Sequence, residues 1–176
     1  MSIQPLGSTA TDVMLGHRGP VVVSCFFGWP NGSSLKAAAD AQRQVIAQYG
    51  KVVTLSIVPP VDLQRAKNAA VTLDVPAEER DASTRKTAEV TEELAAHTVA
   101  SAMVILTPGV VGVMVRSFLA AVSLMSRSQV PLKTFRSLAE AVAWLETVPE
   151  SPGLFPRLTQ DIETWLSETA TATDAR

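Results

Sequence analysis

The sequence predicts an α/β fold with a mostly parallel sheet of about five strands and helices packed on it. The first observation is the segment 101–126, where an apolar run meets a Thr-Pro-Gly turn and then a stretch that is apolar on nearly every side. Proline and glycine interrupt a strand, and a helix that is apolar all round is a buried one. The second observation is the alternation of strand-like and helix-like segments, which is typical of parallel strands joined by helical crossovers. The expected order is β-β-α-β-α-β-α-β-α, followed by one more helix.

Five segments are predicted to be strands because each is short, apolar and bounded by turn residues. The first is expected to be an edge strand, whereas the continuous apolar runs of the second and third suit strands covered on both faces. The five segments are 12–18, 21–27, 52–58, 102–106 and 130–135.

Two helices precede the central turn. The first is expected to take Ser33 or Ser34 as its N-cap and to end at Gly50, a residue that tolerates the left-handed conformation of a helix terminus. The second has Pro76 in its first turn and is expected to run to about Thr98.

Two further helices, one ambiguous segment and the C-terminal tail complete the prediction. A helix over 110–126 follows the central turn, and a capping box of Ser137 and Glu140 opens the next helix. Residues 61–75 permit either a loop or a short helical turn. The small, polar tail 169–176 is expected to be frayed.

The chain is expected to form one α/β domain over 1–148, followed by a linker, an amphipathic helix and a tail over 149–176. Leu158, Ile162 and Trp165 lie at helical spacing in the second part. Such an apolar stripe should dock back on the domain or on a neighbour.

Composition limits the classes of function. The formal net charge is −2 and basic residues are interleaved with acidic ones, so no nucleic-acid surface is expected. The apolar stretch 110–125 is too short for a membrane span and contains Arg116. No signal peptide is recognised, so a cytoplasmic location is expected. The mean hydropathy of +0.20 suggests that a partner, such as a second copy, covers apolar surface.

No residue constellation for catalysis is recognised. Cys25 is the only cysteine and lies in a strand-like apolar run, so it is interpreted as a core thiol and not as a nucleophile. His17 and His97 have no carboxylate or second histidine at ligand spacing, so no metal site is expected. Motifs for nucleotide binding and for a nucleophile elbow are missing, and neither a cofactor nor an enzymatic activity is expected.

The segments 106–114, LTPGVVGVM, and 135–145, FRSLAEAVAWL, resemble parts of the STAS-like superfamily, typified by the anti-sigma-factor antagonists of sporulation. The segment 106–114, LTPGVVGVM, is similar to the Asp-Ser-Ser-Gly-Leu-Gly-Val-Leu pattern that opens the signalling helix of the antagonists. The segment 135–145, FRSLAEAVAWL, is similar to the strand-then-helix ending of the broader group. The resemblance covers about 12–148 and implies a non-enzymatic protein-binding or regulatory module.

The chain departs from the antagonists at the phosphorylated turn. The serine that a kinase modifies in that family is matched by Pro108, the leading aspartate is matched by Leu106, and Thr107 is the only hydroxyl left. The matching turn also follows the fourth predicted strand, whereas the family's turn follows the third. The usual phosphoserine switch is therefore not expected.

The helix over 110–126 is expected to carry two apolar stripes. One would cover the sheet and comprises Val111, Met114, Val115, Phe118, Val122 and Met125. The other is interrupted only by Ser117, and it is either buried against a neighbouring helix or exposed as a protein-binding face, most economically in a homodimer. The candidate face comprises Thr107, Gly109, Val110, Val113, Ser117, Ala121 and Leu124.

A small-ligand site is the alternative function. Ligands of parallel sheets collect beyond the carboxyl ends of the strands, where the turns 28–34, 59–60 and 107–109 should meet. Helix N-termini there favour an anion, so an anionic or lipid-like ligand is considered. The competing interpretation is that these residues cap a helix, shape a turn and cover the core. The candidate residues are Trp29, Asn31, Ser33, Ser34 and Thr107.

Overall fold

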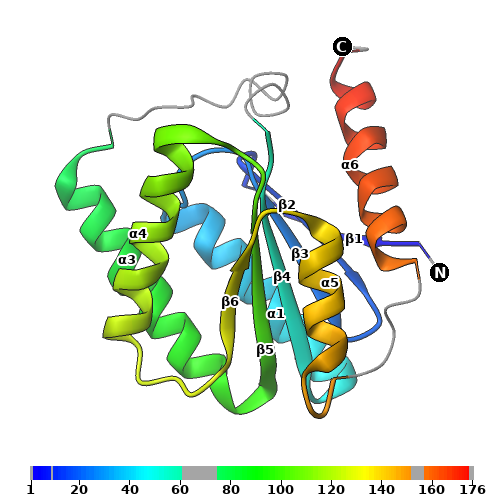
Figure 1. Ribbon diagram of the computed structural model, residues 1–176, viewed down its shortest axis with the longest axis horizontal. Helices are drawn as coiled ribbons and strands as arrows, with labels where there is room; N and C mark the ends of the chain where they lie inside the picture. Colours follow the sequence, from blue (N-terminus) through cyan, green and yellow to red (C-terminus); the bar gives the residue numbers. More distant parts are fainter. Residues whose placement is uncertain (1, 9, 61–74, 152–156, 175–176) are drawn as a thin grey trace.

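The computed structural model describes residues 2–8, 10–60, 75–151 and 157–174. It confirms the α/β class, with a mostly parallel sheet lying between two layers of helices (Figure 1). The interpretation of 61–74 as a loop or helical turn concerns residues outside this part of the chain.

Six strands form the sheet within the described residues, and their order in the sheet is their order in the chain. The first two pairs of neighbours are antiparallel and the other three are parallel. The strands are β1 (Gln4–Leu6), β2 (Val13–Arg18), β3 (Val21–Phe26), β4 (Val52–Val58), β5 (Thr98–Ile105) and β6 (Leu132–Phe135).

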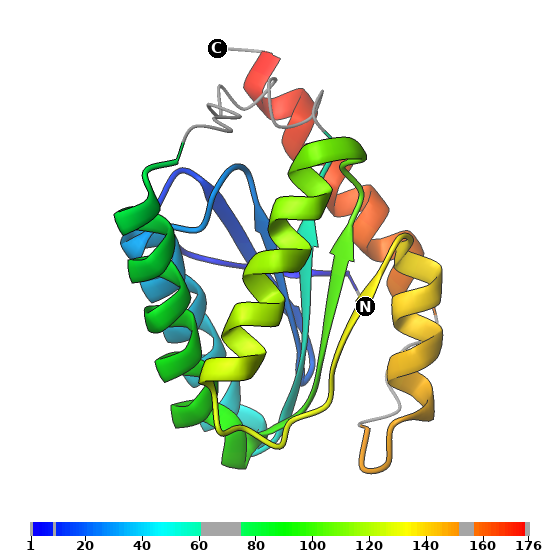
Figure 2. The same cartoon turned by 60° about the vertical axis from the view of Figure 1, so that its left-hand side comes forward.

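The helices that cross between parallel strands share one face of the sheet, and the last two helices cover the other (Figures 1 and 2). Crossovers of one hand that always step in the same direction place their helices on the same face. The first layer contains α1 (Gly32–Tyr49), α3 (Ala77–Leu94) and α4 (Gly109–Met125), and the second contains α5 (Leu138–Thr147) and α6 (Leu158–Asp174).

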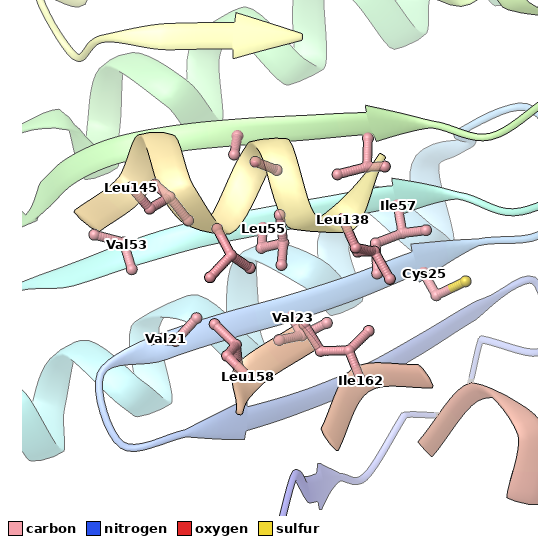
Figure 3. Close-up of a cluster of buried hydrophobic side chains, with 14 of the residues drawn as sticks. Val21, Val23, Cys25, Val53, Leu55, Ile57, Leu138, Leu145, Leu158 and Ile162 are labelled. Carbon is pink, nitrogen blue, oxygen red and sulfur yellow. The ribbon is translucent and has the colours of Figure 1, made fainter. Parts of the chain in front are cut away.

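The largest core cluster lies between the sheet and the second helical layer (Figure 3). Alternate side chains of a strand point to opposite faces, so Val23 and Leu55 reach this cluster whereas their chain neighbours face the first layer. Leu145 of α5 and Ile162 of α6 are fully buried in it.

The C-terminal helix docks on the domain as part of this core. Leu158 and Ile162 are fully buried, and Arg18 of β2 forms an ion pair with Asp161 at 2.8 Å. The helix continues to Asp174, so the expectation of a frayed tail from residue 169 is wrong for the described part.

The structure corrects the prediction for the N-terminal edge of the sheet. β1 was not predicted, because its three residues, Gln4, Pro5 and Leu6, are too few to give a period-two signal. It pairs with β2, so the segment predicted as an edge strand lies inside the sheet. The close approach requires Gly16, since a Cβ there would lie 2.6 Å from the side chain of Ile3.

The boundary between the second predicted helix and its strand is also corrected. The helix α3 ends at Leu94 and is followed by a 3-10 turn, η1 (Ala95–His97). The strand β5 then begins at Thr98, four residues before the predicted start at 102. Small residues such as Ser101 hid this part of the strand from a search for apolar runs, although it pairs with β4.

Candidate functional site

The second stripe of α4 faces solvent in the monomer. Val110, Val113 and Leu124 are 65%, 55% and 88% exposed, so burial of these three residues against a neighbouring helix is excluded within the described chain. Ser117 is also exposed and Ala121 is half-buried. Of the two alternatives left open by the sequence, the monomer therefore has the exposed one at these three positions.

The opposite side of α4 packs toward the sheet and toward α3. Val115, Phe118 and Val122 are buried as predicted, and Leu119, which neither stripe included, is buried with them. Met125, assigned to the buried stripe, is 49% exposed because it lies in the last turn of the helix. The buried side of α4 thus includes Leu119 and does not include Met125.

Thr107 does not belong to the exposed face. Its side chain is 2% exposed, and its hydroxyl donates a hydrogen bond to the carbonyl oxygen of Pro59 at 2.5 Å. This bond joins the turns that follow β4 and β5. The next turn residue, Gly109, has φ +73°, a left-handed conformation that favours glycine. Both residues therefore position α4.

Asn31, Ser33 and Ser34 form the N-terminal cap of α1. The Asn31 side chain accepts hydrogen bonds from the backbone N–H groups of Ser33 and Ser34, and the Ser34 hydroxyl accepts one from the backbone N–H of Asn31. The N-cap is Asn31 and not either serine, which corrects the sequence prediction. Asn31 Nδ2 also donates to Asp12 Oδ2 at 2.6 Å. The side chains of Asn31 and Ser34 therefore make their hydrogen bonds within the fold and serve the cap of α1.

Trp29 lies apart from that cap and contacts α4. Its ring meets the ring of Phe118 edge-on, with centroids 5.2 Å apart and planes at 70°. Its Nε1–H is buried and has no hydrogen-bond partner among the described residues. A buried tryptophan N–H usually finds a partner.

A cavity of about 170 Å³ lies between the sheet and the first helical layer. Trp29 lines it, whereas the other four candidate ligand residues do not. It also receives hydroxyl-bearing side chains from the sheet, among them Ser24 and Ser56. This cavity was not predicted, because a single serine in each of two apolar strands, Ser24 and Ser56, does not by itself indicate a cavity.

The cysteine and the two histidines considered in the sequence have structural positions in the fold. Cys25 is fully buried, as predicted. His17 and His97 each place Nδ1 3.0 Å from a backbone carbonyl oxygen, of Gly19 and Gly50 respectively. In the described ranges, no group of three or more histidine, cysteine or acidic residues could hold a metal ion. The same ranges contain no helix with the length and hydropathy of a membrane span.

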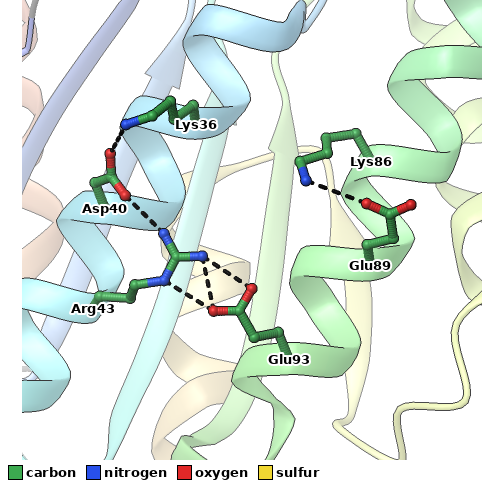
Figure 4. Close-up of polar contacts among 6 residues, drawn as sticks. All are labelled: Lys36, Asp40, Arg43, Lys86, Glu89 and Glu93. Carbon is green, nitrogen blue, oxygen red and sulfur yellow. Dashed lines mark hydrogen bonds and ion pairs between the residues drawn. The ribbon is translucent and has the colours of Figure 1, made fainter.

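Charged side chains form a bridge between α1 and α3 on the outer surface (Figure 4). Lys36 contacts Asp40, Asp40 contacts Arg43, and Arg43 reaches Glu93 of α3. Hydrogen bonding and attraction from Lys36, with a smaller contribution from Arg43, hold the pKa of Asp40 below its ordinary value. Because these side chains are exposed to solvent, the ion pairs are interpreted as surface contacts between α1 and α3 and not as a functional site.

Neither a family model, nor a curated protein, nor a solved structure matches this chain. The STAS-like resemblance therefore stays a prediction.

Proposed function

We propose that this chain is a non-enzymatic binding module that works as a homodimer through the exposed face of α4. The observation that carries the proposal is the exposure of Val110, Val113 and Leu124 along one side of a helix whose other side is core. Contiguous apolar surface of this kind marks association sites. A STAS-like regulatory role and a cytoplasmic location are parts of the same proposal.

The spacing of the face favours a second copy as the occupant. Val110 and Leu124 lie seven residues on either side of Ser117, and Val113 and Ala121 lie four residues on either side of it. Two antiparallel copies of α4 that cross at Ser117 would place Leu124 of each against Val110 of the other. A two-fold interface has to be self-complementary in this way.

Side-chain sizes along the face agree with such a crossing. Ser117, at the centre, is small and exposed, which permits close approach of two helix backbones. Val113 would meet Ala121 of the second copy, so that a larger side chain faces a smaller one. Burying each valine or leucine would stabilise the dimer by about 1.5–3 kcal/mol before the cost of association is subtracted.

The turn that opens α4 supports a constitutive interface. Thr107 is buried and hydrogen-bonded to Pro59, so its hydroxyl is not presented to a kinase in this conformation. Pro108, at the position of the phosphorylated serine in the resembled family, has no hydroxyl. The proposal therefore contains no phosphorylation switch at this turn.

Val113→Glu tests the proposal, with Ala82→Glu as the matched control. Both positions are exposed on helices, and each new carboxylate has a basic residue three positions later, Arg116 or Arg85, so both variants should fold normally. Light scattering after size exclusion is expected to give a dimer mass for the wild type and Ala82→Glu, and a monomer mass for Val113→Glu. A monomeric wild type, or a dimeric Val113→Glu variant, would show that α4 is not the interface.

A further inference from the structure

We propose that the cavity between the sheet and the helices α1, α3 and α4 is a binding site for a small neutral molecule that has one ring and one oxygen acceptor. This site lies under α4, on the side of the helix opposite the exposed face. The inference does not depend on the homodimer.

The size of the cavity sets the size of the ligand. Its volume is about 170 Å³, and an apolar cavity of about 150 Å³ is large enough to hold a benzene molecule. Phe26, Leu35 and Met103 are among the apolar side chains that line it, and Phe118 and Val122 of α4 close it from the helical layer. These walls fit a single ring and not a long lipid chain.

Three of the residues that line the cavity carry a hydrogen-bond donor without a partner among the described residues, whereas others, such as Gln42 and Thr98, bond each other. Ser24 and Ser56 lie opposite each other in the register of β3 and β4, so their side chains share one face of the sheet. Neither hydroxyl makes a hydrogen bond to any described residue, whereas Thr54 and Ser101 bond each other at 2.8 Å. The Trp29 Nε1–H is buried and unpartnered as well. Unpartnered donors on a buried wall are unfavourable unless an acceptor is brought to them.

The charge of the wall selects a neutral ligand. No acidic, basic or histidine side chain is among the described residues that line the cavity. A carboxylate or phosphate buried there would have no cation to offset its loss of hydration. A ketone or ether oxygen, by contrast, accepts hydrogen bonds from hydroxyl and indole N–H groups without carrying a charge. The anionic ligand considered from the sequence is therefore disfavoured at this cavity.

The test uses acetophenone as the probe and ethylbenzene as its counterpart without oxygen. In 15N-labelled protein, the indole N–H signals of Trp29, Trp144 and Trp165 report separately once Trp29→Phe has assigned the first. Acetophenone is expected to move the Trp29 signal downfield in a saturable way, and ethylbenzene to bind about three- to tenfold more weakly, as expected for the loss of one hydrogen bond. Benzoate should bind more weakly than acetophenone.

Three variants separate cavity binding from other sites. The double variant Ser24→Ala, Ser56→Ala should bind acetophenone and ethylbenzene with similar affinity, and Ser56→Leu, which fills the cavity, should abolish the Trp29 shift while the rest of the spectrum stays dispersed. Val113→Glu should bind acetophenone like the wild type, because that residue is on the outer side of α4. The proposal is overturned if no saturable shift occurs up to about 10 mM probe, if Ser56→Leu folds and binds as the wild type does, or if Val113→Glu removes the binding.

Discussion

Replacing Gly112 by alanine should destabilise the protein, although the same change stabilises most helices. In a helix interior, alanine is favoured over glycine by about 1 kcal/mol. A Cβ built on Gly112, however, would lie 2.6 Å from the backbone carbonyl oxygen of Thr107, a distance that real Cβ atoms essentially never show. Thr107 is itself held by its hydrogen bond to Pro59, so the start of α4 has to move instead.

The size of the effect follows from these two terms. The contact is about 0.8 Å shorter than ordinary van der Waals contact at 3.4 Å, and overpacking of this kind costs about 1–3 kcal/mol. After the helical preference of alanine, about 1 kcal/mol, is subtracted, a net loss of up to about 2 kcal/mol is expected. For a chain of this length the melting temperature should fall by about 2–4 °C per kcal/mol.

Thermal unfolding followed by circular dichroism measures this loss, with Gly32→Ala as the control. Gly32 is the first residue of α1, and a Cβ there would meet no atom within 4 Å. Gly32→Ala should leave the melting temperature unchanged or raise it slightly. If Gly112→Ala raises the melting temperature as well, the packing argued for the turn before α4 is incorrect.

Two further predictions concern the C-terminal helix and the acid stability. Ile162→Ala removes a fully buried side chain from the core under α6, so urea unfolding should show a loss of about 2–5 kcal/mol in the free energy of unfolding. Thr164→Ala, on the exposed side of the same helix, should change that free energy by less than about 0.5 kcal/mol. Equal effects of the two substitutions would contradict the docking of α6. Because the folded-state pKa of Asp40 is lowered, its contribution is present above the ordinary carboxyl pKa of about 4 and is lost as the pH falls through and below that value. Asp40→Asn should therefore weaken the pH dependence of the urea midpoint on the acid side, and 1 M salt should reduce the difference from the wild type.

The fold was predictable where the pattern of apolar residues was strong. The continuous apolar runs placed β3 and β4 to within one residue, because a strand covered on both faces has no polar side to interrupt it. Proline and glycine at Pro108 and Gly109 placed the start of α4 in the same way. β1 was missed because its three residues, which include Pro5, are too few to show the alternation of a strand.

The candidate site was predictable in part for similar reasons. The two stripes of α4 followed from helical periodicity, but the sequence could not decide whether Val113 faced a neighbouring helix or solvent, since both give the same spacing. The cap at Asn31 was assigned to the following serines because asparagine and serine are both good N-caps. The cavity depends on how far the helices α1, α3 and α4 stand from the sheet, and no local pattern encodes that distance.

The variant Ser117→Cys tests the proposed homodimer most directly. The two-fold axis is proposed to pass beside Ser117, so two copies of Ser117→Cys should come within reach of a disulfide, while the native Cys25 is fully buried. Leu124 lies about 10 Å along the helix from that axis, which leaves the two copies of Leu124→Cys about 20 Å apart.

Under mild oxidation, Ser117→Cys is therefore expected to form a covalent dimer on a non-reducing gel, and Leu124→Cys is expected to stay monomeric on the same gel. Cross-linking of Leu124→Cys in preference to Ser117→Cys, or of neither variant at concentrations where the wild type is a dimer, would contradict an antiparallel crossing of α4.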